Sequence, residues 1–267
     1  LEASSPVRVT LHTNMLTANP QQLDKMKLAE PFTSIRRITT MTISSFMNHL
    51  IAFHGENTFN PWNDTDPDYD IEGAAAIRRK NLADYLSLRL GKAKILLVAE
   101  ACGYQGGQFS GIAMTCERML LDCHPVVTSD MIFRRPGERT SRPDSPFITK
   151  PTQREKGFNE PTDSVVWKAC LDAGLSPEEF LLWNIFPFHP YKKGNLLTNR
   201  TPTDEELSIG LSYTKELLTL TGSLPLFAIG KKSETTLMEA GFSVTGLRHP
   251  ANGGANIFRA QLKDALS

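Results

Sequence analysis

Four short runs of apolar residues, separated by helix-like segments, constrain the fold of this chain more than any other feature of its sequence. They are KILLVA at 94–99, FLLWNIF at 180–186, LPLFAI at 224–229 and the segment 242–247. Short strands that are apolar on both faces are typical of a parallel sheet with helices packed on each side. The sequence therefore predicts an α/β fold in which these runs form the central sheet.

The segments between these runs carry helix signals. Apolar residues recur with helical spacing over 71–90, and residues 203–206 have the form of a capping box that opens a helix running towards Gly222. Residues 176–179 have the same form, with proline at the first helical position. Strands that alternate with helices imply right-handed crossovers, and so a three-layer α/β/α sandwich around a central, mainly parallel four-stranded sheet. Further helices are predicted at 164–173, 233–240 and 255–266.

Length and charge limit what the chain can do. Its 267 residues, 40% of them hydrophobic, suffice for one α/β domain with a buried core. Lysine and arginine total 29 against 29 acidic residues, so binding to a nucleic acid requires a local basic patch rather than a basic protein. We expect residues 1–60 to form an N-terminal extension packed on the core and residues 61–267 to form the functional domain.

The sequence also carries expectations about location and cofactors. No apolar run reaches the roughly 18 residues that span a bilayer, and the first residues lack the pattern of a signal peptide. We therefore expect a cytoplasmic protein that does not bind membranes, and a monomer. Neither metal nor cofactor is expected, because the cysteines show no spacing typical of zinc or iron–sulfur sites. They are Cys102, Cys116, Cys123 and Cys170.

A long stretch, 124–163, shows no convincing periodicity. Its part up to residue 156 contains seven cationic and four acidic side chains, a local balance of +3. Loops of this length in a compact domain are usually functional or disordered. Two interpretations stay open, a solvated surface loop and an arm that contacts phosphates. The cations are Arg134, Arg135, Arg139, Arg142, Lys150, Arg154 and Lys156.

Three polar side chains follow the predicted strands. Glu100 opens a glycine-rich turn after the first strand, Asn184 lies near the end of the second, and His249 follows the fourth. Each taken alone has an ordinary structural explanation, such as capping a helix or satisfying a turn. Because ligands of open α/β sheets bind at the carboxyl ends of the strands, we expect these three side chains to meet at one edge.

The runs that contain these residues resemble a known family. ILLVAEACGYQGGQFSGIAMTCER looks like the first motif of the uracil-DNA glycosylase superfamily, close to subgroups that read GEAPGYRG followed by GIPFT. WNIFPFHPYKKGNLLTNRTPTDEE is similar to its Asn-bearing strand and NRTPT loop, and RHPANGG resembles its His-Pro motif. With the IEGAAAIRRKNLADYL helix, the resemblance covers roughly residues 60 to 265. It implies a uracil-DNA glycosylase-like fold and a monofunctional DNA glycosylase, with DNA, double- or single-stranded, as partner.

The resemblance also implies roles. Glu100 matches the polar residue of the first motif and is expected to activate water or stabilise an oxocarbenium sugar. Asn184 matches the side chain that reads the flipped base, and His249 matches the histidine that binds O2 of the departing base. Further base-binding positions are Gly103, Tyr104, Met114 and Phe109. The expected DNA contacts are Arg200, Lys231, Lys232, Arg248, Ala251, Asn252, Gly253 and Gly254.

Departures from the family pattern bear on the substrate. Ala101 stands where many members place an aspartate or asparagine that positions water, and Cys102 replaces a proline. Met114 replaces the aromatic residue on which the base stacks, and Gly103 stands where uracil-specific members carry a tyrosine that excludes groups on C5. We expect either uracil, stacked instead on Phe109 or Trp62, or a pyrimidine enlarged at C5, including hypermodified cytosines of phage DNA.

Two other functions stay open. One is a catalytically weak protein that binds DNA or senses modified bases on the same scaffold, which the changes at Ala101, Cys102 and Met114 suggest. The other is a nucleotide-binding enzyme of unrelated chemistry. It is disfavoured because the turn after the first strand matches neither G-x-G-x-x-G nor G-K-[ST]. His189 and Tyr191 either line the site or belong to a packed loop.

Overall fold

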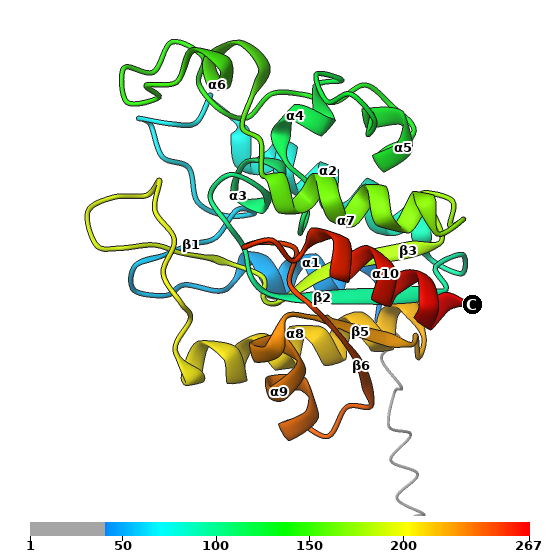
Figure 1. The fold of residues 1–267 in the computed structure, drawn as a ribbon. Coiled ribbons are helices and arrows are strands. Elements are labelled where there is room, and N and C mark those ends of the chain that lie inside the picture. The colour runs from blue at the N-terminus through cyan, green and yellow to red at the C-terminus, as the bar shows by residue number, and fades with distance from the viewer. Residues whose placement is uncertain (1–40) are drawn as a thin grey trace, which may run out of the picture. The chain divides into compact units, whose positions relative to one another are not determined.

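The computed structural model describes residues 41–267, which contain a four-stranded sheet with the strand order β3-β2-β5-β6 (Figure 1). All of its strand pairs are parallel. The predicted strands are confirmed, although the ends of three of them differ from the prediction by one or two residues. The strands are β2 (Ile95–Ala101), β3 (Phe180–Phe186), β5 (Leu226–Ile229) and β6 (Val244–Leu247).

Helices cover both faces of this sheet. The helices α7 (Pro161–Asp172) and α10 (Ala255–Leu266) pack together on one face, while α8 (Asp204–Thr221) packs on β3 from the other (Figure 1). On the same side as α8, α9 (Lys231–Glu239) connects β5 with β6. The three-layer α/β/α architecture predicted from the sequence is confirmed.

Helix α8 shows how the local sequence sets an element. The side chain of its N-cap Thr203 accepts a hydrogen bond from the backbone N–H of Glu206, and the Glu206 carboxylate accepts one from the backbone N–H of Thr203, as the capping box predicts. Gly222 follows its last turn with a φ of 82°, a backbone conformation that favours glycine. Helix α2 (Ala74–Arg89) falls within the segment predicted to be helical.

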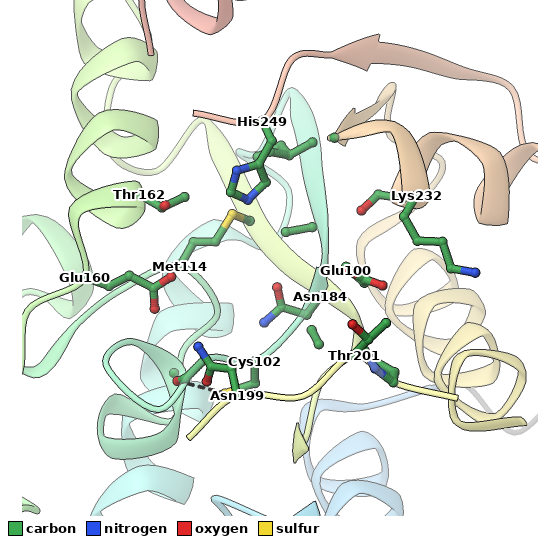
Figure 2. A pocket seen from close by; sticks show the side chains of 18 of the residues that line it. Glu100, Cys102, Met114, Glu160, Thr162, Asn184, Asn199, Thr201, Lys232 and His249 are labelled. Carbon is green, nitrogen blue, oxygen red and sulfur yellow. Dashed lines mark hydrogen bonds between the residues drawn. The ribbon is translucent and has the colours of Figure 1, made fainter. Parts of the chain in front are cut away.

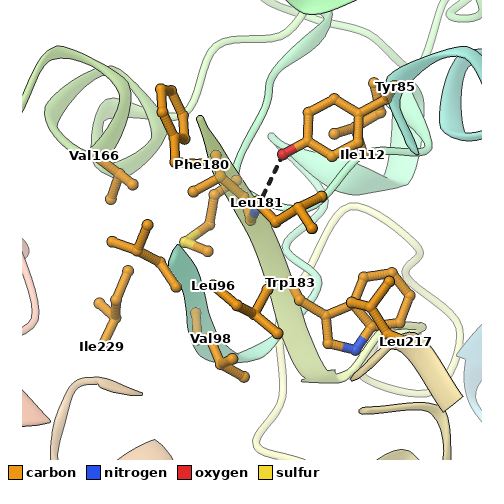
Figure 3. Close-up of a cluster of buried hydrophobic side chains, with 14 of the residues drawn as sticks. Tyr85, Leu96, Val98, Ile112, Val166, Phe180, Leu181, Trp183, Leu217 and Ile229 are labelled. Carbon is orange, nitrogen blue, oxygen red and sulfur yellow. Dashed lines mark hydrogen bonds between the residues drawn. The ribbon is translucent and has the colours of Figure 1, made fainter. Parts of the chain in front are cut away.

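The core lies between the sheet and its helices. Val166 from α7 and Leu217 from α8 lie on opposite sides of β3 (Figure 3). Every residue of β3 is buried, including Trp183, which is 1% exposed. The hydroxyl of Tyr85 accepts a hydrogen bond of 2.9 Å from the backbone of Leu182, so that this buried phenol is satisfied (Figure 3).

The segment that precedes α2 also joins the core. Helix α1 (Ile43–Ile51) begins with a capping box at Thr42 and buries Phe46 and Leu50 completely. Strand β1 (Thr58–Phe59) pairs with β4 (His189–Pro190) in a small antiparallel sheet that the sequence did not predict. Residues 1–40 of the predicted extension lie outside the described residues, so its boundary at residue 60 stays a prediction.

One predicted helix is wrong. Residues 176–179 form a turn that leads directly into β3, although Glu179 does accept the hydrogen bond from the backbone of Ser176 that a capping box supplies. No helix follows this hydrogen bond, because the next residues are apolar and continue as the strand. The stretch 124–163 instead contains three helix segments, short α5 (Ser129–Phe133), short α6 (Pro151–Lys156) and the start of α7.

The remaining helical elements are short. They are α3 (Gly107–Ser110) and α4 (Glu117–Leu120), which follow the glycine-rich turn after β2. Within residues 41–267, no helix has the length and apolar character that crossing a bilayer requires. The four cysteines are free thiols, and all but Cys123 are buried.

Candidate active site

A cavity of about 460 Å³ opens at the carboxyl edge of the sheet, where β2, β3 and β5 end (Figure 2). It is built from separate segments of the chain: the end of β2 and the turn after it, Met114 after α3, the start of α7, the end of β3, the loop before α8, and the residues after β5 and β6. Of the residues predicted to act on a base or on DNA, the following line it: Glu100, Gly103, Met114, Asn184, Arg200, Lys231, Lys232 and His249.

Strand register brings Glu100 and Asn184 together. Ala99 of β2 pairs with Asn184 of β3, so the carboxylate that follows Ala99 lies beside the amide (Figure 2). Asn184 is 2% exposed, and its Oδ1 has no hydrogen-bond partner. Oε1 of Glu100 is also buried without a partner. Burial raises the pKa of Glu100, and the positive charge of Lys232 opposes that shift.

His249 is held in one tautomer. The backbone N–H of Ala251 donates to Nδ1 of His249 at 3.1 Å, so Nδ1 acts as an acceptor and the proton of the neutral ring belongs on Nε2. Burial, together with the nearby Arg248, lowers the pKa of His249. The ring therefore reaches the cavity as a neutral hydrogen-bond donor (Figure 2).

The start of α9 forms one wall of the cavity. Lys231 and Lys232 are exposed there, and their ammonium groups contact Glu234 at 3.1 Å and Asp204 at 3.3 Å. Surface ion pairs of this kind are weak, so both cations remain free to exchange partners. Ser233 is 1% exposed, and its hydroxyl has no partner although it lines the cavity.

Arg200 lies at the cavity but is committed to other contacts. Its two terminal nitrogens donate to the two oxygens of Glu206 at 2.7 and 2.6 Å, and one of them also reaches the carbonyl of Asn57 at 3.2 Å. This bidentate pair fixes the loop before α8. The predicted contact of Arg200 with DNA stays a prediction.

Met114 takes the place that the resemblance gives to an aromatic ring. It lines the cavity and adopts a φ of 47°, which is uncommon for a residue other than glycine. Neither aromatic alternative lies at the cavity. Phe109 is fully buried and stacks on Phe158 with 4.2 Å between ring centroids, and Trp62 is 2% exposed and donates to the carbonyl of Gly111.

The glycine-rich turn is tied to the loop before α8. The backbone N–H of Tyr104 donates to Oδ1 of Asn199 at 3.1 Å, while the Tyr104 ring packs edge-on against Phe158 outside the cavity lining. His189 lies beneath the same turn and is fully buried, with its ring nitrogens 3.0 Å from the carbonyl of Cys102 and 2.9 Å from that of Leu196. His189 thus belongs to the packed loop and does not line the site.

Two acidic residues of the cavity were not predicted. Glu160 and Asp163 begin α7 and lie next to the glycine-rich turn. Burial raises the pKa of Glu160 to about 7, and burial together with the charge of Glu160 raises that of Asp163. They follow the basic part of the long loop, in the sequence EPTD, which looks like an ordinary helix start.

The loop after β6 is exposed beside the cavity. Ala251, Asn252 and Gly253 form an exposed turn, with φ values of 54° at Asn252 and 75° at Gly253. Gly254 is required for space, because a β-carbon there would lie 2.0 Å from the carbonyl oxygen of His249. These positions suit an inserting loop but do not line the cavity, and neither does the exposed Arg248.

The basic loop uses many of its arginines internally. Arg135 donates to Asp84 and Asn81, and Arg139 donates to backbone carbonyls and to Ser141. Arg134 pairs with Glu178 and Asp130. Because these arginines are paired within the protein, their contacts count against the interpretation of this loop as an arm that contacts phosphates. In the part of the chain that the structure describes, no group of three acidic, histidine or cysteine side chains is arranged to hold a metal ion.

Comparisons with known proteins bear on the fold. No protein-family model matches the sequence, and no curated protein matches it. Among solved structures, the chain is similar to wild-type SMUG2 from Pedobacter heparinus, with a TM-score of 0.54, over 84% of this chain and 97% of that one. The two proteins share a fold. Because their sequences are only 13% identical, the similarity extends to the fold alone.

Proposed function

We propose that the protein is a monofunctional DNA glycosylase that flips a pyrimidine nucleotide into this cavity and hydrolyses its N-glycosidic bond. One observation carries the proposal. Buried polar atoms from four elements, all without a hydrogen-bond partner, line the same cavity: Glu100 Oε1, Asp163 Oδ2, Asn184 Oδ1 and Ser233 Oγ. Buried polar groups are nearly always paired, so this unpaired set favours a polar ligand in the cavity. The shared fold with SMUG2 supports the same conclusion.

The charges of the site match the proposed reaction. As the bond between C1′ and the base nitrogen breaks, its electron pair stays on the base and positive charge develops on the sugar. The Glu100 carboxylate stabilises that charge, and water then bonds to C1′ and gives its proton to Glu100. Nε2–H of His249 donates to the developing negative charge on O2 of the base. The departing base takes its proton from solvent.

Asn184 supplies recognition in this mechanism. A carboxamide offers a donor and an acceptor side by side, which suits the edge of a flipped pyrimidine. The rotation of this amide decides whether it pairs with a uracil-like or a cytosine-like edge. Lys231, Lys232 and Arg248 would bind phosphates of double- or single-stranded DNA, with the loop 251–254 entering the minor groove.

The cavity favours a pyrimidine enlarged at C5. Its lining contains no aromatic ring except that of His249, and flexible Met114 adapts to irregular shapes. A β-carbon at Gly103 would lie 2.8 Å from Oε2 of Glu160, so a tyrosine at this position would displace that carboxyl group from the cavity wall. Hypermodified cytosines of phage DNA belong to this substrate class, which would give a cytoplasmic, monomeric enzyme a role in defence against phage.

Excision assays test the proposal. DNA strands that contain one uracil or one C5-modified pyrimidine are incubated with the protein, and abasic sites and released bases are measured. We expect Glu100→Gln to lower excision at least 100-fold, while Glu239→Gln, an exposed acid of α9, matches the wild type. Full excision by the Glu100 variant would refute the mechanism. Tight binding without an abasic product would instead indicate a protein that senses modified bases.

A further inference from the structure

The acidic pair Glu160 and Asp163 lies on the far side of the cavity from Glu100 and has no part in the mechanism above. In Figure 2, Glu160 faces Glu100 and Lys232 across Asn184. The exposed lysines mark the side that meets the DNA backbone, whereas Asp163 is 1% exposed. The pair therefore lies at the inner end of the cavity, where the outer edge of a flipped base would arrive.

The two carboxyl groups face a single small space. A β-carbon on Gly106 would lie 2.7 Å from Oε2 of Glu160 and 2.8 Å from Oδ2 of Asp163, and one on Gly103 would lie 2.8 Å from the same Glu160 oxygen. Glycine at these two positions therefore lets both carboxyl groups pack against the turn, where Oδ2 of Asp163 is buried.

No structural role accounts for the pair. Glu160 is the N-cap residue of α7, but its side chain accepts no capping hydrogen bond, and Pro161 occupies the first turn. Among residues 41–267, neither carboxyl forms an ion pair, and Oδ2 of Asp163 is buried without a partner. Leaving buried acids unpaired destabilises a protein, so a ligand that satisfies them is the simpler explanation.

A second observation points to the same ligand. Asn184 belongs to another element, is 2% exposed and lines this cavity, and its Oδ1 has no hydrogen-bond partner. Asn184, Glu160 and His249 thus lie around one volume (Figure 2), which Asp163 also lines. The pair adds acceptors to a site in which His249 already supplies a donor.

We propose that Glu160 and Asp163 select pyrimidines that carry hydroxyl or amino hydrogens on the edge away from the sugar. This rests on the proposed function and names its substrate class: cytosine-type bases with a hydroxyl-bearing C5 group. A hydroxyl group donates to one carboxylate oxygen, and the amino group on C4 can donate to another. Although burial raises the pKa of both acids, each carboxyl group keeps an oxygen that accepts such a hydrogen, whereas a C5-methyl group supplies none.

The experiment compares bases that differ by one donor. Four DNA strands carry uracil, cytosine, 5-methylcytosine or 5-hydroxymethylcytosine at one position, and a fifth carries a glucosylated 5-hydroxymethylcytosine. Excision is followed by mass spectrometry of the released base, and binding of each strand by fluorescence anisotropy. The full-length wild type is compared with Glu160→Gln, Asp163→Asn and the control Glu239→Gln, after melting curves have established that each variant is folded.

At pH 8, where Glu160 is ionised, we expect the wild type to prefer hydroxymethylcytosine over methylcytosine by about 10- to 100-fold, the effect of one hydrogen bond to a charged group. Glu160→Gln and Asp163→Asn should reduce that ratio about tenfold or more, and Glu239→Gln should preserve it. An equal ratio in wild type and variants, in excision or in binding, would overturn the inference. If excision occurs with that ratio unchanged, the proposed glycosylase stands and only the role of the acidic pair is wrong.

Discussion

Replacing His249 tests the geometry of the site most closely, because its tautomer follows from a single contact. The Ala251 N–H that donates to Nδ1 directs the remaining ring proton to Nε2 and so into the cavity. Loss of one preorganised donor to a developing anion lowers kcat about 100- to 1000-fold, equivalent to about 3–4 kcal/mol. We expect that loss for His249→Ala and also for His249→Phe, which keeps a ring but no donor.

Single-turnover excision on the best substrate measures the effect, with enzyme in excess so that product release does not contribute. Because burial lowers the pKa of His249, the ring is neutral at pH 7 and the rate should fall only on the acid side of the profile. Protonation of the Glu100 carboxylate, whose pKa burial raises, contributes a second loss of rate as the pH falls. A rate within threefold of wild type for both His249 variants would refute this assignment.

Three further predictions concern stability and specificity. Gly254→Ala should lower both Tm and excision, because its β-carbon would lie 2.0 Å from the carbonyl oxygen of His249. Gly253→Ala has open space around its β-carbon and should lower the free energy of unfolding by only about 1–2 kcal/mol, the cost of a φ of 75°. Equal losses of Tm in the two variants would contradict this. Met114→Phe should tighten the binding of uracil-containing DNA about tenfold or more, measured by fluorescence anisotropy, because it supplies a ring on which the base can stack. Unchanged affinity would show that the missing ring does not limit the binding of uracil. Glu160→Gln should raise Tm at pH 8 more than at pH 5. The folded-state pKa of Glu160 is raised from 4.5 to about 7, so the stability of the wild type falls as the pH rises through that range, while that of the variant does not. A difference in Tm between variant and wild type that is independent of pH would exclude this.

Much of the fold could be predicted because the strands are apolar on both faces. FLLWNIF matches β3 residue for residue, and the box at Thr203 starts α8 as expected. Residues 176–179 show the limit of such local signals. The same cap hydrogen bond forms there, but a strand follows, because the apolar run gains more from joining the sheet than a new helix would gain from its cap.

The predicted site residues fall into two groups. Glu100, Asn184 and His249 meet because the parallel strands end at one edge of the sheet. The alternation of strands and helices in the sequence predicts this parallel topology, so their meeting could be predicted. Phe109 and Arg200 depend on neighbours that are distant in sequence, so their actual partners, Phe158 for the ring and a carboxylate for the guanidinium, were not predictable.

Glu160 and Asp163 were missed for a related reason. Acids near a helix start are common, and nothing in EPTD separates a pair that faces a cavity from one that faces solvent. The distinguishing facts are the burial of Asp163 and the position of both acids against the glycine-rich turn, which only the folded chain creates.

The most direct test of the account is a structure of the protein bound to DNA whose target nucleotide carries 2′-fluorine, which slows cleavage by destabilising positive charge on the sugar. We predict that the base lies in the cavity, with its edge against Asn184, its O2 at Nε2 of His249 and its sugar beside Glu100. A base that remains stacked in the DNA, with this cavity empty, would contradict the central claim.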